Sequence, residues 1–519
     1  MSRQKSDRRV VPQGARKGVP TAPIERAWGG KAATVEQQTW QLGLRFETAE
    51  APQGTDGGAA SPLRDPATSA APKSKRKEET VTLATMEEIT RRLSGAFEKV
   101  AANHGAAGPD RQSIAQVRAH LNEMLVELTD ALLGGTYEPG NIRRVWIPKA
   151  SGGKRGLGIP NVVDRVVQEA VRQVLEPLYE PTFHASSHGF RPKRSGHAAI
   201  AEARQHLEEG HEWVVDLGLE KFFDRVHHQR LMSRLAQRVE DKRLLVLIGK
   251  MLRAKVVMPD GVVVSTDEGV PQGGPLSPLL SNIVLDELDS ELERRGHRFV
   301  RYADDCNIDV CSERAGQRVM ASLVSFIERR LRLKVNASKS AVARPEERHF
   351  VGFRLRREPL NGEVEVLLSK RSKDRIDERI RELTPRWWGL PLRACIEAIN
   401  VYSLGWLGFF GICTEGIERV LGNLDAHIRR RLRAIQVRHW KRRSTMAHKR
   451  VALGVARKVA WRNVYGGRKS SWALSQTTAM HRGLRNAYFA DRGLVSIADH
   501  WRNRTRHLVA PAQLTLALG

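Results

Sequence analysis

The chain has 519 residues, 41% of them hydrophobic, and its 86 Lys and Arg against 58 Asp and Glu give a formal net charge of +28. This is the composition of a globular protein of three or four parts, and the charge makes nucleic acid the first partner to consider. The sequence contains no apolar run near the ~20 residues of a membrane span, no signal core, and no zinc or disulfide spacing among its four cysteines. We therefore expect no membrane partner and a location in the reducing cytoplasm.

The first segment, residues 1–80, is rich in Gly, Ala, Pro, Arg and Lys and has no sustained periodicity. Such a composition predicts a disordered basic tail. The folded part of the chain is expected to begin with a helix at Thr85 and Glu88, which have the spacing of a capping box. Apolar residues at helical spacing continue to about residue 132. These helices are predicted to be scaffold.

Two basic, glycine-containing segments come next. Residues 142–160 have two strand-like arms around a Ser-Gly-Gly bend, with Lys149, Lys154 and Arg155 beside the bend. Residues 186–200 form a second basic loop with glycine at intervals. A flexible basic hairpin can grip phosphates, although a solvated turn would explain the same residues.

Strands and helices then follow in mixed order. EWVVDLGLEKFFDRV, residues 212–226, alternates as a strand, and residues 269–289 place a Gly- and Pro-rich turn before an apolar helix. Short hairpins recur between the helices, which indicates an α+β domain rather than a doubly wound sheet. From about residue 365 the pattern predicts helices only.

An acidic hairpin lies within this region. FVRYADDCNIDV, residues 299–310, has two strand-like runs around Asp304 and Asp305. Two adjacent carboxylates repel each other beside an apolar strand, so either a turn exposes them or a divalent cation neutralises them. The surrounding motifs decide between these two explanations.

Those motifs resemble the successive blocks of the group II intron-encoded reverse transcriptase/maturase family. In order along the chain they read KRGLGIP, SHGFRPKRSGHAAI, DLGLEKFFDRV, GVPQGGPLSPLLSNI, RYADD, LKVNASKS and FVGF. The likeness runs from about residue 85 to the C-terminus and is specific because it is cumulative. It implies a right-hand polymerase with basic fingers, a palm that carries the acidic hairpin, a helical thumb or maturase X domain, and a small C-terminal nucleic-acid-binding segment.

The resemblance also implies roles for single residues. Asp304 and Asp305 would be catalytic and would bind two Mg²⁺ ions, which activate a primer hydroxyl and stabilise the departing pyrophosphate. Five further residues would contact the incoming nucleotide, with Phe223 closing the sugar pocket as a steric filter. These are Lys154, Arg155, Phe223, Gln272 and Lys339.

One position departs from the family pattern. The first metal-binding aspartate of the family lies five residues before the second Phe, and here that residue is Gly218. Asp216 lies on the same strand face but two residues away, roughly 6–7 Å by strand rise, so it cannot simply replace the missing ligand. The chain is then a maturase that has lost polymerisation, a mutated copy, or a polymerase with a rearranged site that uses Asp216 or Glu220.

The C-terminal part is expected to bind RNA. Between residues 425 and 450 Arg and Lys greatly outnumber one acid, which is too dense for an ordinary solvated face. We expect an RNA groove lined by Arg429, Arg430, Arg431, Arg433, Arg438, Trp440, Lys441, Arg442 and Arg443. The family's HNH endonuclease module is not expected. The predicted parts are a tail (1–80), fingers and palm (81–360), a thumb or X domain (361–450) and a nucleic-acid-binding segment (451–519).

Two functions remain open at this point. The first is RNA-directed DNA synthesis during intron mobility, with an RNA template, a DNA primer or target, dNTPs and Mg²⁺. The second is a maturase that binds intron RNA and assists splicing, with its polymerase impaired by Gly218. A more remote third is a reverse transcriptase recruited to defence or repair. The sequence does not predict the oligomeric state.

Overall fold

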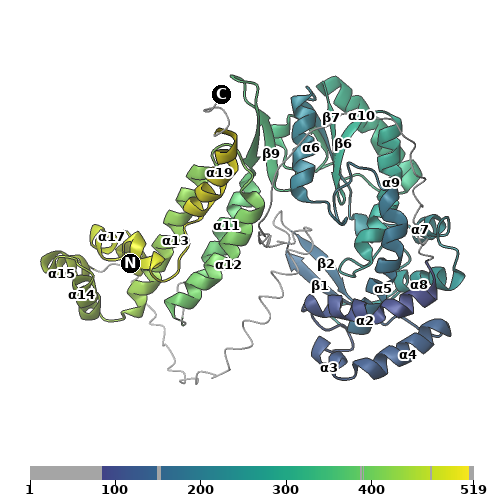
Figure 1. Cartoon of the computed structure of the whole chain (residues 1–519), viewed down its shortest axis with the longest axis horizontal. Helices are drawn as coiled ribbons and strands as arrows, with labels where there is room; N and C mark the ends of the chain where they lie inside the picture. Colours follow the sequence, from purple (N-terminus) through teal and green to yellow (C-terminus); the bar gives the residue numbers. More distant parts are fainter. Residues whose placement is uncertain (1–83, 149–152, 386–388, 390, 468–469, 514–519) are drawn as a thin grey trace, which may run out of the picture.

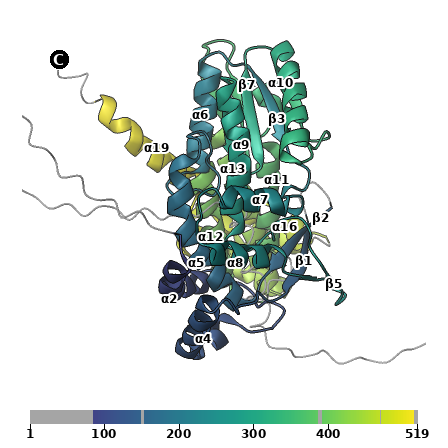
Figure 2. The same ribbon diagram turned by 90° about the vertical axis from the view of Figure 1, so that its right-hand side faces the viewer.

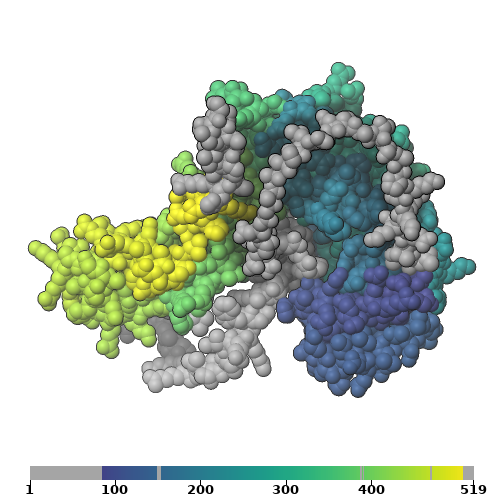
Figure 3. Space-filling view, viewed as in Figure 1, coloured from purple at the N-terminus to yellow at the C-terminus, as the bar shows by residue number. Residues whose placement is uncertain are grey.

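The structure is a computed structural model, and it describes residues 84–148, 153–385, 389, 391–467 and 470–513 (Figure 1). The expected tail and Lys149 lie outside these residues. In the space-filling view, purple and blue N-terminal helices and yellow and green C-terminal helices occupy opposite sides of the molecule (Figure 3). Within the described ranges, no helix is both long enough and apolar enough to cross a membrane.

The N-terminal helices pack around α5 (Val162–Tyr179), which is buried along most of its length. Helix α2 (Met86–Ala102) lies along α5, and α3 (Ile114–Ala119) and α4 (Leu121–Leu133) complete this layer. Thr85 caps α2 as predicted, since its hydroxyl accepts from the Glu88 amide at 3.3 Å. The Glu88 side chain pairs with arginines of the next turn.

A four-stranded sheet carries the predicted basic hairpin. The hairpin pairs β1 (Ile142–Pro148) with β2 (Lys154–Ile159), and the sheet order is β2-β1-β4-β5. The amide of Gly158 in β2 donates to the carbonyl of Gln272 at 2.7 Å. The predicted Gly- and Pro-rich turn therefore contacts this sheet. The other strands of the sheet are β4 (Val256–Val257) and β5 (Val263–Val264). The same part of the chain also contains η1 (Glu180–Thr182), α7 (His228–Leu235) and α8 (Lys242–Leu252).

A second four-stranded sheet carries the acidic hairpin, and its order is β6-β7-β3-β8. Helices α6 (Gly196–Glu208) and α10 (Glu313–Phe326) lie on either side of it (Figure 2). Both faces are buried, because Phe299 packs into one hydrophobic core and the next residue, Val300, packs into the other. The remaining elements are β3 (Trp213–Gly218), α9 (Ser277–Arg294), β6 (Arg298–Tyr302), β7 (Asp305–Val310), η3 (Ile327–Leu331) and β8 (Ala341–Ala343). The mixture confirms the predicted α+β class.

A third sheet pairs β9 (Phe353–Arg357) with β10 (Val364–Leu368). The run HFVGFRLR predicts a strand where β9 lies, but β10 was not predicted, because the sequence indicated helices from about residue 365. Val364 and Val366 are buried on one side of β10, so this strand has the alternation that the sequence analysis missed. The expected boundary at residue 360 falls between the two strands.

The C-terminal helices share a core with α6 and β9, which joins them to the second sheet. Helix α13 (Ile417–His439) runs through this lobe and contacts α16 and α19. The other helices are α11 (Lys370–Leu383), α12 (Leu392–Phe410), α14 (Arg443–Ala452), α15 (Arg457–Tyr465), α16 (Ser471–Leu474), α17 (Thr478–Gly483), α18 (Asn486–Ala490) and α19 (Ile497–Gln513).

Candidate active site

The hairpin of β6 and β7 presents two acids at the end of the second sheet. Tyr302 pairs with Asp305, so Ala303 and Asp304 form a two-residue turn between the strands. Ala303 has a φ of 57°, a left-handed conformation that is strained for a residue with a Cβ. A Cβ at Gly189 would lie 2.2 Å from the Ala303 amide nitrogen, so Gly189 allows another loop to pack against this turn.

Arg301 holds the turn from inside the protein. Its side chain is fully buried and donates from Nε to Asp289 Oδ1 at 2.7 Å. Its Nη1 donates to the carbonyl of Ala303 at 2.9 Å and to Asn282 Oδ1 at 3.0 Å. Its Nη2 donates to Ser187 Oγ at 2.7 Å. Arg301 therefore links the backbone of the strained turn to α9 and to the loop before α6.

Gly218 lies beside the acidic hairpin. It is the last residue of β3 and pairs with Asp305 across the sheet. A Cβ built on Gly218 would contact only the Lys339 side chain, at 3.5 Å and beyond, which is ordinary van der Waals distance. The position expected for the first metal ligand is thus adjacent to Asp305, has room for a side chain, and offers no carboxylate.

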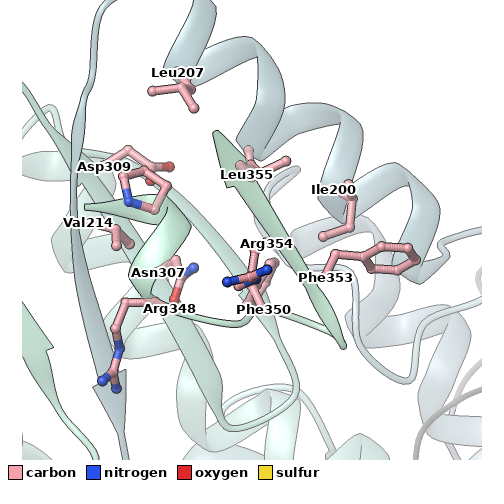
Figure 4. Close-up of a pocket in the computed structure, with 12 residues that line it drawn as sticks. Ile200, Leu207, Val214, Asn307, Asp309, Arg348, Phe350, Phe353, Arg354 and Leu355 are labelled. Atoms are coloured by element: carbon pink, nitrogen blue, oxygen red, sulfur yellow. The ribbon is translucent and has the colours of Figure 1, made fainter. Parts of the chain in front are cut away.

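Asp216 and Glu220, the two alternative ligands, are both paired with arginines. Asp216 accepts from Arg348 Nε at 2.8 Å, and Glu220 lies 3.0 Å from Arg225 Nη2. Arg348 follows η4 (Pro345–Glu347) and lines a small pocket between α6, β7 and β9 (Figure 4). Neither carboxylate is available to replace the one missing at position 218 without breaking an ion pair.

Asp305 has a perturbed acidity. Removal from bulk water raises its pKa to about 7, and the negative charges of Asp304 and Asp216 act in the same direction. Lys339 and Arg155 oppose this rise. Asp305 is an exposed residue at the end of the hairpin, and desolvation by the protein around it is nevertheless the largest cause of the rise in its pKa.

The donor set does not fit a two-metal site. Two metal ions need carboxylates that converge from neighbouring strands, and the neighbouring strand β3 offers only Asp216, which is paired with Arg348. Among the described residues, no three His, Cys, Asp or Glu side chains are grouped so that they could hold a metal ion. The site therefore lacks a ligand set for the expected pair of Mg²⁺ ions.

The residues expected to contact a nucleotide border the same site. Phe223, in η2 (Phe222–Asp224), is half-buried, and its carbonyl accepts from the Val270 amide at 2.6 Å. Gln272 follows on that loop, and Lys339 lies next to Gly218. On β2, Lys154 is exposed and Arg155 is half-buried. Their predicted roles stay predictions, since no bound nucleotide tests them.

The expected RNA-binding residues separate into two groups. Arg433 and Trp440 are buried: Arg433 Nε donates to the Leu484 carbonyl at 3.1 Å, and Trp440 belongs to the hydrophobic core. Their side chains face protein, so we leave both out of the proposed RNA surface. The other residues remain at least partly exposed, and Lys441, Arg442 and Arg443 are the most accessible.

Several charged side chains of α13 already contact other parts of the protein. The Arg430 guanidinium lies 3.8 Å from the ring centroid of Trp472, and Arg431 Nη2 donates to the Thr384 carbonyl at 2.6 Å. The one acid of the run, Asp425, is buried and accepts from the amide of Ile497 at 3.0 Å at the start of α19. Sequence reasoning missed these contacts because the partners lie about 40 to 70 residues away along the chain.

Comparison with known proteins agrees with this geometry. Residues 147–355 match the family of reverse transcriptases (RNA-dependent DNA polymerases), and residues 373–452 match the maturase-specific domain of group II introns. The first match contains the whole sheet of the acidic hairpin and all of the other four-stranded sheet except most of β1, and the second contains α12, α13 and α14. The class of protein that fold and site define is thus a reverse transcriptase with a maturase domain.

Individual relatives narrow this class. Protein YkfC of Escherichia coli K12 is 33% identical over 300 residues, which are 50% of this chain and 78% of that protein. The group II intron-encoded protein LtrA of Lactococcus lactis is 29% identical over 333 residues, 49% of this chain and 55% of LtrA. The chain belongs to the group II intron-encoded reverse transcriptase/maturase family.

Among solved structures, a chain of a partial Cas6-RT-Cas1–Cas2 complex matches at 23% identity and a TM-score of 0.31. That match covers 47% of this chain and 42% of the other. The likeness is too slight to support an argument.

Proposed function

We propose that this chain is a maturase that binds intron RNA and assists its splicing, and that its polymerase activity is impaired. It would act in the cytoplasm on RNA that carries out its own splicing chemistry, with the protein supplying cationic surface that neutralises phosphates. Family membership supports the RNA partner, and the geometry around Gly218 supports the impairment.

The observation that carries this proposal is the pairing of Gly218 with Asp305. A carboxylate at position 218 would face the acidic hairpin directly, and the nearest alternative, Asp216, is held by Arg348. Losing one preorganised ligand typically costs at least ~10²-fold in rate. Polymerisation would therefore fall much further than RNA binding, which depends on surfaces elsewhere.

The RNA surface that we propose is smaller than the one predicted from sequence. It centres on the exposed cations at the start of α14, which are Lys441, Arg442 and Arg443, with Arg429 and Arg438 on the preceding helix. Each phosphate contact contributes to affinity by releasing counterions, so binding should weaken as salt rises.

A second candidate function is an active RNA-directed DNA polymerase that uses an RNA template, a DNA primer, dNTPs and Mg²⁺. The surviving parts of the site favour it: the strained turn is held by Arg301, and the loops of Phe223 and Gln272 are in contact with each other and with β2. The palm has therefore kept the framework of a polymerase site.

One preparation of the protein can separate the two candidates. Binding of a structured intron RNA is measured by filter retention, and extension of a DNA primer on an RNA template is measured in parallel. The proposal predicts tight RNA binding with feeble extension. Extension as fast as that of an otherwise identical Gly218→Asp protein would overturn the proposed impairment, and loss of RNA binding would overturn the maturase function.

A further inference from the structure

A buried cation without an anionic partner lies in the unit formed by α14, α15 and α17. Arg450 is fully buried, and its one hydrogen bond within the described part of the chain runs from Nη1 to Asn463 Oδ1 at 2.7 Å. Its Nε and Nη2 have no hydrogen-bond partner among the described residues. Burial lowers the pKa of Arg450 to about 10, so the group remains charged at neutral pH. An unpaired charge in the interior is costly, and proteins normally supply it with an acceptor.

The core around Arg450 is thin. Within the described residues this unit has its own small hydrophobic cluster of Val455, Ala460 and Ala479, with Val451 packed against it. Two of its three buried members are alanines, which remove little apolar surface from water. Met446 of α14 and Met480 of α17 pack into the larger core of the lobe, so α15, which the small cluster holds, opens more easily than its neighbours.

The surface of the same unit has the composition of a nucleic-acid contact. Trp461 and Tyr465 of α15 stack with ring centroids 5.4 Å apart and planes inclined by 8°, and Tyr465 is 47% exposed. Arg457, Lys458 and Arg462 of the same helix are exposed. Aromatic faces with interleaved cations suit bases and phosphates of a nucleic-acid strand. The unit lies at the far end of the molecule from the acidic hairpin (Figure 1).

We propose that a backbone phosphate of bound nucleic acid is the missing partner of Arg450, and that α14, α15 and α17 tighten around the strand when it binds. The Arg450 guanidinium offers Nε and Nη2 as a pair of donors, which matches two phosphate oxygens. In the free protein both donors are enclosed, so the phosphate reaches them only as the unit opens. This inference rests on the proposed nucleic-acid binding and adds the site and its coupling to local order.

Hydrogen exchange of backbone amides tests the coupling in the full chain. The protein is measured free, with a single-stranded RNA oligonucleotide, and with a DNA duplex of equal length, while fluorescence anisotropy monitors binding in the same samples. Residues 443–465 should gain protection of at least about tenfold with one of the two ligands, as expected for a charge-assisted hydrogen bond. The ligand that increases the protection of these amides identifies the bound strand as RNA or DNA.

Three variants make the test specific. Arg450→Leu should raise protection of residues 443–465 in the free protein, because an apolar side chain replaces an unpaired charge, and should abolish the gain on binding. Arg450→Lys keeps the charge without the paired donors and should lose most of the gain. Lys449→Leu, which removes an exposed charge next to Arg450, should keep the full gain in protection on binding.

The outcomes are distinguishable. If Arg450→Leu retains the full gain in protection, or if the chain binds either ligand without any gain in this unit, Arg450 is not the phosphate receptor. If neither ligand binds at all, the proposed nucleic-acid function fails as well.

Discussion

Replacing Gly218 by Asp should restore primer extension. Gly218 pairs with Asp305, and a Cβ at this position meets only the Lys339 side chain at 3.5 Å. The amide of Gly218 donates to Ser340 Oγ at 3.0 Å and its carbonyl accepts from the Asn336 amide at 2.8 Å, and neither bond uses a side chain at position 218. The substitution should therefore fold without rearranging β3.

The size of the effect follows from the missing ligand. A third carboxylate beside the hairpin should raise the rate of extension at least ~100-fold over the unmodified protein. In the absence of Mg²⁺ the same carboxylate adds negative charge next to Asp305, whose pKa is already raised to about 7. We therefore expect the Tm of Gly218→Asp to fall in EDTA and to recover when Mg²⁺ is added.

Single-turnover extension of a DNA primer on an RNA template measures the rate. Gly218→Asn is the matched control, because it has the same size without the charge, and it should recover little activity. Equal rates for the Asn and Asp forms, or no gain in either, would refute the view that position 218 lacks only a metal-binding carboxylate.

Three further predictions concern other parts of the structure. Asp216→Ala in the restored enzyme should leave extension nearly unchanged while lowering the free energy of unfolding by about 1–2 kcal/mol, because Arg348 loses its hydrogen-bonded partner; abolished extension would mean that Asp216 binds the metal. Arg301→Leu should lower the free energy of unfolding by about 3–5 kcal/mol in denaturant titrations, since it leaves a buried Asp289 unpaired; a change below 1 kcal/mol, the order of an exposed ion pair, would contradict this. Neutralising the cations at the start of α14, which are Lys441, Arg442 and Arg443, should reduce the slope of log RNA affinity against log salt concentration by about 2. The matched control neutralises the exposed cations Arg314, Arg318 and Lys334 and should leave the slope unchanged.

Local sequence patterns predicted the parts of the site that depend on short-range order. The alternation around Asp304 and Asp305 predicted the hairpin. The family resemblance implied that position 218, five residues before Phe223, is the first metal-ligand position, and the structure pairs that position with Asp305. The contacts of Arg348 with Asp216 could not be predicted, because the two residues are 132 positions apart and no periodicity connects them.

Composition alone was a poorer guide in the C-terminal lobe. Arg433 and Trp440 fit a basic, aromatic run, yet both side chains are buried in the lobe, because α13 packs against the earlier helices α11 and α12 and the later helices α16 and α19. Strand β10 was missed because its alternation is short and lies directly before a strongly helical segment. In both cases tertiary packing determined the burial or the secondary structure, which the residue types alone did not predict.

The most direct test of the central claim is binding of Mn²⁺ as a paramagnetic substitute for Mg²⁺, measured by electron paramagnetic resonance on the protein with a primer–template bound. Because position 218 supplies no carboxylate and Asp216 is paired with Arg348, the unmodified protein should bind Mn²⁺ in the palm at least about tenfold more weakly than Gly218→Asp. Equal affinity in the two proteins would contradict the account.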